Sequence, residues 1–156
     1  MKRETLLLKL ALAVIGLIVI ALGIIVVPFL VDGTMHIMHG FSFVMGGGLL
    51  VTCGCVLNAV VQAYTLLQRI DQNTAFSLKS VTALKRIKWS AYLVALVFLA
   101  MLPLAYWWTD AADAPGILLL SCIILAAATV IGVFASILQK LVANAFTFKT
   151  ENELTI

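Results

Sequence analysis

Residues 69–88, RIDQNTAFSLKSVTALKRIK, separate two long apolar segments and carry five of the ten Lys and Arg residues in this 156-residue chain. The flanking segments, residues 41–67 and 89–108, contain no charged residue. A helix that crosses a hydrocarbon core about 30 Å thick needs roughly 20 apolar residues. The pattern therefore predicts a transmembrane helix on each side of a basic loop.

Two further apolar segments, residues 6–30 and 116–138, lie toward the ends of the chain. With 63% hydrophobic and 11% charged residues, the composition lies far outside the range of soluble domains. These features predict an all-α fold, a four-transmembrane-helix bundle that forms one membrane domain over residues 1–156. A C-terminal tail, residues 139–156, follows the fourth span.

The charges outside the spans are distributed asymmetrically. Besides the five cations of the inner loop, the Lys and Arg residues lie before or in the first turn of span one or after span four: Lys2, Arg3, Lys9, Lys140 and Lys149. The other two connections carry only acids and histidines: Asp32, His36, His39, Asp110 and Asp113. Cationic loops stay in the cytoplasm. Both termini and the inner loop are therefore predicted to be cytoplasmic.

The inner loop is itself predicted to contain a short amphipathic helix. From Phe76 onward, apolar or small residues recur at helical spacing, and Lys79, Lys85 and Arg86 lie on the opposite face. Ser77 is a suitable N-cap. Two interpretations stay open: an anchor at the membrane interface, or a docking surface for a cytoplasmic protein.

Small and polar residues inside the spans are candidates for helix packing. Span four has Ala128, Gly132 and Ser136 at four-residue intervals. In span two, Asn58 lies about 16 Å along the helix from Arg69, near the expected bilayer centre. Asn58 and Gln62 are therefore expected to form hydrogen bonds to another helix, with the lining of a ligand path as the alternative.

The outer loop contains a doubled Met-His pair, Met35-His36-Ile37-Met38-His39. Thioethers and imidazoles suit copper, so a metal or pH sensor is one interpretation and an ordinary interfacial loop is the other. We expect no cofactor. The spans carry no ionisable side chain at their centre, which argues against an ion-coupled pump. No catalytic motif is present, so the chain is not expected to be an enzyme.

Several segments together resemble the YoaS-like bacterial membrane proteins, a family of unknown function. The similar segments are residues 70–77, 80–88, 113–116, 133–135, 138–141 and the tail 149–156. The Met-His loop and Cys53-Gly54-Cys55 look peculiar to this chain. The resemblance implies a small multi-pass protein of the bacterial plasma membrane. It also implies a pairing with a small helix-turn-helix regulator, and it supplies no catalytic residues.

These observations predict a non-enzymatic, regulatory membrane protein that binds or sequesters a cytoplasmic partner such as that regulator. No direct contact with nucleic acid is expected, and homo-oligomerisation stays open. The predicted partner-binding residues are Arg69, Asp71, Asn73, Lys79, Lys85, Arg86 and Lys88, together with Glu151 and Glu153 of the tail. The alternative is a small transporter, channel or immunity-type protein that acts on a hydrophobic or peptide compound.

Overall fold

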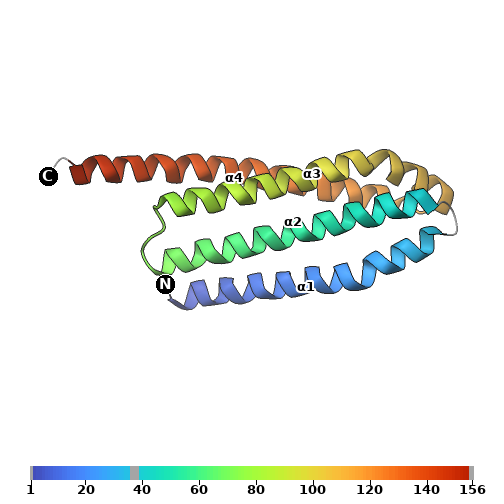
Figure 1. Ribbon diagram of the computed structural model, residues 1–156, viewed down its shortest axis with the longest axis horizontal. Helices are drawn as coiled ribbons and strands as arrows, with labels where there is room; N and C mark the ends of the chain where they lie inside the picture. Colours follow the sequence, from blue (N-terminus) through green and yellow to red (C-terminus); the bar gives the residue numbers. More distant parts are fainter. Residues whose placement is uncertain (1, 36–38, 155–156) are drawn as a thin grey trace.

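The computed structural model describes residues 2–35 and 39–154. They form four helices: α1 Lys2–Met35, α2 His39–Asp71, α3 Leu78–Ala112 and α4 Gly116–Leu154. Each helix is long and apolar enough to cross a membrane, so the prediction of an all-α fold with four helices of membrane-spanning length is confirmed for the described residues. Both ends of the chain and the connection between α2 and α3 lie at the same end of the molecule (Figure 1). We call this end the basic end, because the sequence places the lysines and arginines there.

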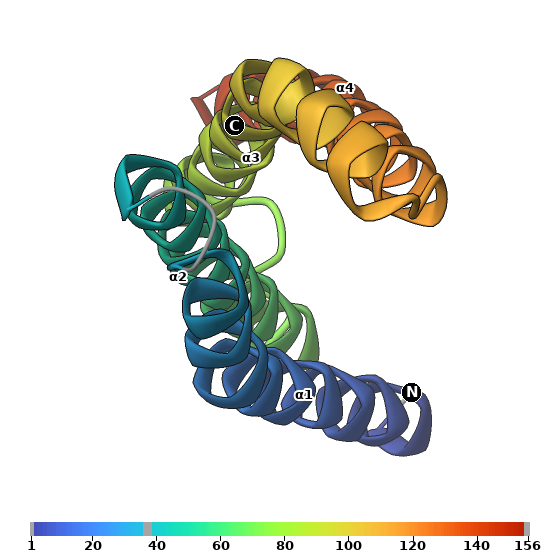
Figure 2. The same ribbon diagram turned by 90° about the vertical axis from the view of Figure 1, so that its right-hand side faces the viewer.

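The four helices form an open row. Within the described part of the chain, α1 packs against α2 only, α2 also packs against α3, and α4 packs against α3 only. Seen along the helices, the row curves into a crescent, with α1 and α4 as its two tips (Figure 2). The expected bundle therefore does not close. Lipid tails are as apolar as leucine, so no hydrophobic force draws α1 and α4 together.

Two glycines seven residues apart, Gly16 and Gly23, lie in the contact between α1 and α2. A Cβ atom added at Gly16 would lie 3.6 Å from Val60, and one at Gly23 would lie 3.4 Å from Cys53 Sγ. The absent side chains let the two backbones approach closely. This seam is not among the contacts predicted above, although the spacing of the glycines is visible in the sequence.

Helix α3 is the centre of the packing. Most of the buried apolar residues lie on it, and Val94, Ala95 and Phe98 form a core cluster with Ala128 of α4. Gly132 of α4 is buried, and a Cβ atom there would lie 2.9 Å from Cε1 of Tyr92. Helix α3 thus holds α4 in place through small residues on α4.

The connection at the basic end is defined by backbone hydrogen bonds. Asn73 has a left-handed backbone (φ 56°), and the N–H of Thr74 donates to the carbonyl of Arg69 at 2.9 Å. This arrangement closes the C-terminus of α2 as a Schellman motif. Ser77 then caps α3, since its side chain accepts a hydrogen bond from the N–H of Ser80.

The short amphipathic helix predicted between spans two and three is not a separate element. Its residues are the first turns of α3, which continues without a break to Ala112. Ser80, Ala83 and Leu84 are buried, whereas Lys79 and Lys85 are exposed. The amphipathic pattern thus buries one side of a continuous helix.

The predicted C-terminal tail also continues a helix. Helix α4 has 39 residues, which corresponds to about 58 Å at 1.5 Å per residue, roughly twice the thickness of a hydrocarbon core. Its last part runs past the ends of the other three helices (Figure 1). We call residues 140–154 the arm.

Candidate functional site

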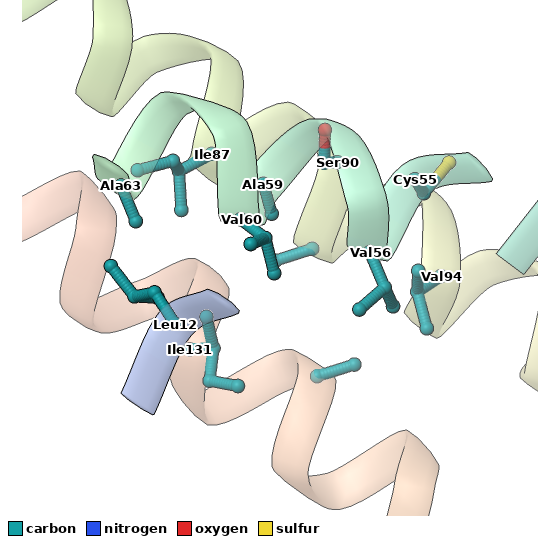
Figure 3. A pocket seen from close by; sticks show the side chains of 12 residues that line it. Leu12, Cys55, Val56, Ala59, Val60, Ala63, Ile87, Ser90, Val94 and Ile131 are labelled. Atoms are coloured by element: carbon teal, nitrogen blue, oxygen red, sulfur yellow. The ribbon is translucent and has the colours of Figure 1, made fainter. Parts of the chain in front are cut away.

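The concave side of the crescent contains an apolar groove of about 250 Å³. Side chains from all four helices line it (Figure 3), and they are Leu12, Cys55, Val56, Ala59, Val60, Ala63, Ile87, Ser90, Ala91, Val94, Ala128 and Ile131. The lining is apolar apart from the Cys55 thiol and the Ser90 hydroxyl. Such a groove fits an apolar chain or ring, and its lining supplies no charged group for ion binding.

Next to the groove, the Asn58 side-chain amide donates a hydrogen bond to Ser90 Oγ at 3.0 Å and so links α2 to α3. Gln62 is half-buried, and neither Asn58 nor Gln62 lines the groove. Ser90 directly follows Lys88 and Trp89 in the sequence. The hydrogen bond therefore connects α2 to the beginning of the apolar part of α3. The predicted hydrogen bond from Asn58 to another helix is present, and the depth of Asn58 in the bilayer stays a prediction.

The sequence-predicted partner-binding residues differ in their exposure and in their contacts. Asp71 forms an ion pair with Lys9 and so joins α2 to α1. Arg69 is half-buried, and its buried Nη1 has no hydrogen-bond partner in the described ranges. Asn73 is exposed in the turn after α2, and Lys88 is half-buried on α3.

Three cations of this set remain fully exposed on α3: Lys79, Lys85 and Arg86. Within residues 2–35 and 39–154, none of them forms an ion pair. Their charges are therefore not balanced by the protein itself.

The arm carries both charged and apolar side chains. Leu141 and Phe148 are 61% and 68% exposed and lie seven residues apart, on one side of the helix. Lys149 Nζ lies 4.0 Å from Glu153 Oε1, and Glu151 is also exposed. The predicted site does not include Leu141 and Phe148. Their seven-residue spacing after the last span is visible in the sequence and could have indicated an apolar helix face there.

The predicted metal site falls largely outside the described residues. His36 and Met38 lie outside them, and the side chains of Met35 and His39 are not described either. In the part of the chain that is described, no group of three or more His, Cys, Asp and Glu side chains could hold a metal ion. Cys53, Cys55 and Cys122 are free thiols, and Cys53 packs against Gly23.

Comparison with known proteins agrees with this architecture. Residues 43–156 match the family described as protein of unknown function (DUF2975). The chain is also 37% identical to the uncharacterized membrane protein YoaS of Bacillus subtilis (strain 168), over 99% of both chains. No solved structure matches. The chain therefore belongs to the DUF2975 family of proteins of unknown function, as its resemblance to the YoaS-like membrane proteins indicated.

Proposed function

We propose that this protein is a non-enzymatic regulatory protein of the bacterial plasma membrane that binds a cytoplasmic protein at its basic end. The observation that carries the proposal is the arm. In the orientation that the cation distribution predicts, the arm extends from the membrane into the cytoplasm as a helix.

The exposed apolar residues of the arm support a docking role. Along the spans, exposed leucines and isoleucines face lipid and need no partner. Leu141 and Phe148 lie beyond the last apolar span, where an exposed apolar stripe on one helix face faces water and indicates a partner protein. Apolar anchors at this spacing are typical of a helix that lies in a groove of its partner.

The class of partner follows from the resemblance to the YoaS-like proteins. A small helix-turn-helix regulator held by the arm would be kept at the membrane and away from DNA. The turn after α2, with Asp71 and Asn73, and the exposed Glu151 and Glu153 would border the same surface. They supply polar groups around the two apolar anchors, as is usual at protein interfaces.

Co-purification in mild detergent tests the proposal, with a small helix-turn-helix regulator of the kind that the resemblance implies as the partner. The variant Leu141→Ala/Phe148→Ala is expected to lose most of the captured regulator, because anchor residues cost about 2 kcal/mol or more each when truncated. The control Thr147→Ala/Thr150→Ala removes two exposed hydroxyl groups from the same arm and is expected to retain the regulator. Equal capture by both variants would refute docking through Leu141 and Phe148. No capture by the unmodified protein would refute the regulator as the partner.

The groove supports a second candidate function, a transporter, channel or immunity-type protein that acts on a hydrophobic or peptide compound. Cys55 lines the groove and provides a native probe. In a variant whose other two cysteines are replaced by alanine, a bound compound should slow the reaction of Cys55 with a lipid-soluble maleimide. An unchanged reaction rate across the candidate compounds would argue against this function.

A further inference from the structure

The side of α3 that faces away from the groove carries an ordered series of side chains. Five of them recur at intervals of seven, three, four and three residues and therefore lie on one helix face: Lys79, Arg86, Trp89, Leu93 and Leu96. Lys85 borders this face, one turn before Trp89. All six are exposed. Ile87, Ala91 and Val94 line the groove on the opposite side. We call the six residues the cation–tryptophan face.

The order of residues on this face matches the layers of one bilayer leaflet. Leu93 and Leu96 are 45% and 63% exposed in a span, so lipid tails must cover them. Trp89, 62% exposed, is the residue type that favours the boundary between tails and headgroups. Lys85 and Arg86 lie about 5 to 6 Å before Trp89 along the helix, which is within the thickness of the headgroup layer.

Among the described residues, the cations of the face form no ion pair. The ion pairs there are Lys9 with Asp71 and Lys149 with Glu153, so Lys79, Lys85 and Arg86 are free to bind an anion from outside. At the depth of Lys85 and Arg86 that anion is a lipid phosphate, because a protein docked there would have to displace the headgroup layer. We propose that the cation–tryptophan face binds the headgroups of anionic phospholipids in the leaflet at the basic end.

This inference is independent of the proposed docking of a regulator, which depends on the arm. It assigns Lys79, Lys85 and Arg86 to lipid and not to a protein partner. The lysine and arginine stems would lie along the helix surface while the charged groups reach the phosphates. Each cation near an anionic surface contributes about 1 kcal/mol, which corresponds to roughly fivefold local enrichment of the anionic lipid.

Tryptophan quenching by brominated lipids tests this proposal on the full chain. The substitutions Trp107→Phe and Trp108→Phe leave Trp89 as the single tryptophan and keep aromatic rings next to Phe41. The protein is reconstituted into phosphatidylcholine vesicles that contain a minority of phosphatidylglycerol. Bromines are placed on the phosphatidylglycerol tails in one sample and on an equal amount of phosphatidylcholine in the other. We expect stronger quenching by brominated phosphatidylglycerol, and we expect the excess to decrease with added salt.

Two matched variants show whether the face itself recruits the lipid. Lys79→Gln/Lys85→Gln/Arg86→Gln is expected to abolish the excess quenching. The control variant Lys2→Gln/Arg3→Gln/Lys149→Gln removes the same total charge at other positions and is expected to keep the excess quenching. Quenching by brominated phosphatidylcholine that stays the same or increases shows that each variant is still inserted. Equal quenching by both lipids before substitution, or an excess that survives the first triple change, would overturn the proposal. Loss of regulator capture in the first variant with the lipid excess intact would assign the cations to a protein instead.

Discussion

Gly132 shows how one missing side chain positions a helix in lipid. Its backbone lies against the ring of Tyr92, where an added Cβ atom would be 2.9 Å from Cε1. We expect Gly132→Leu to force α4 away from α3 and to lower the free energy of unfolding by about 1–3 kcal/mol, the usual cost of overpacking. Thermal unfolding in mild detergent measures this loss.

Gly54 provides the matched control for Gly132. It lies on α2, and an added Cβ atom there would meet nothing within 4 Å. Gly54→Leu is therefore expected to leave the unfolding temperature unchanged or to raise it slightly, since Gly is a poor helix former. Equal losses in the two variants would show that the contact with Tyr92 does not set the position of α4.

The hydrogen bond between Asn58 and Ser90 predicts a measurable coupling between α2 and α3. In a double-mutant cycle with Asn58→Leu and Ser90→Ala, we expect a coupling energy of about 0.6 kcal/mol and at most about 1.7 kcal/mol, as for other hydrogen bonds between membrane helices. Unfolding of the four proteins in detergent supplies the values. Strictly additive losses would show that the two side chains do not interact.

Single residues also show which contacts can be predicted from a sequence. Small residues mark the places where membrane helices approach each other, so the stripe with Ala128 and Gly132 was a sound basis for predicting a contact. The stripe did not reveal which helix it would meet. The seven-residue spacing of Gly16 and Gly23 could likewise have indicated a contact between helices. The partner of Asn58, Ser90 of α3, could not be predicted either, because it depends on how α3 lies along α2.

At the scale of the elements, Ser77 determines where α3 begins. Its side chain accepts at 3.4 Å from the N–H of Ser80, which also donates to the carbonyl of Ser77 at 2.9 Å. We expect Ser77→Ala to destabilise the first turns of α3 by about 0.5–2 kcal/mol, and Ser77→Asp to retain the cap. Hydrogen exchange of residues 79–84 measures the effect. Equal protection in the two variants would mean that packing alone fixes the start of the helix.

The lengths of α3 and α4 could not be predicted from hydropathy. Hydropathy identifies the part of a helix that lies in lipid, and all four spans were found in this way. It does not show whether the helix stops at the interface. Leu78 and Leu154 lie outside the apolar segments, and helical propensity together with packing continues both helices into the polar regions. The three cations of the cation–tryptophan face and the arm belong to these extensions.

At the scale of the whole molecule, the surface area is large for the mass of the chain. The molecule exposes 10423 Å², whereas a compact soluble protein of 16.8 kDa would expose roughly 7,700 Å². The additional surface belongs to an open row of apolar helices (Figure 2). The bilayer therefore replaces most of the hydrophobic core. The number of helices could be predicted from their composition, but the open arrangement could not, because lipid and helix surfaces are equally apolar.

The central claim is that four spans place the arm and the cation–tryptophan face in or next to the cytoplasm. Cysteine labelling in intact cells tests it most directly. Cys53, Cys55 and Cys122 are replaced by alanine, and a single cysteine is introduced by Ala111→Cys near the end of α3 or by Asn152→Cys on the arm; both sites are exposed.

A membrane-impermeant maleimide is expected to label the Ala111→Cys protein in intact cells and the Asn152→Cys protein only after the membrane is opened. Labelling of the Asn152→Cys protein in intact cells, or protection of the Ala111→Cys protein until the membrane is opened, would contradict the orientation on which the proposed docking of a cytoplasmic regulator depends.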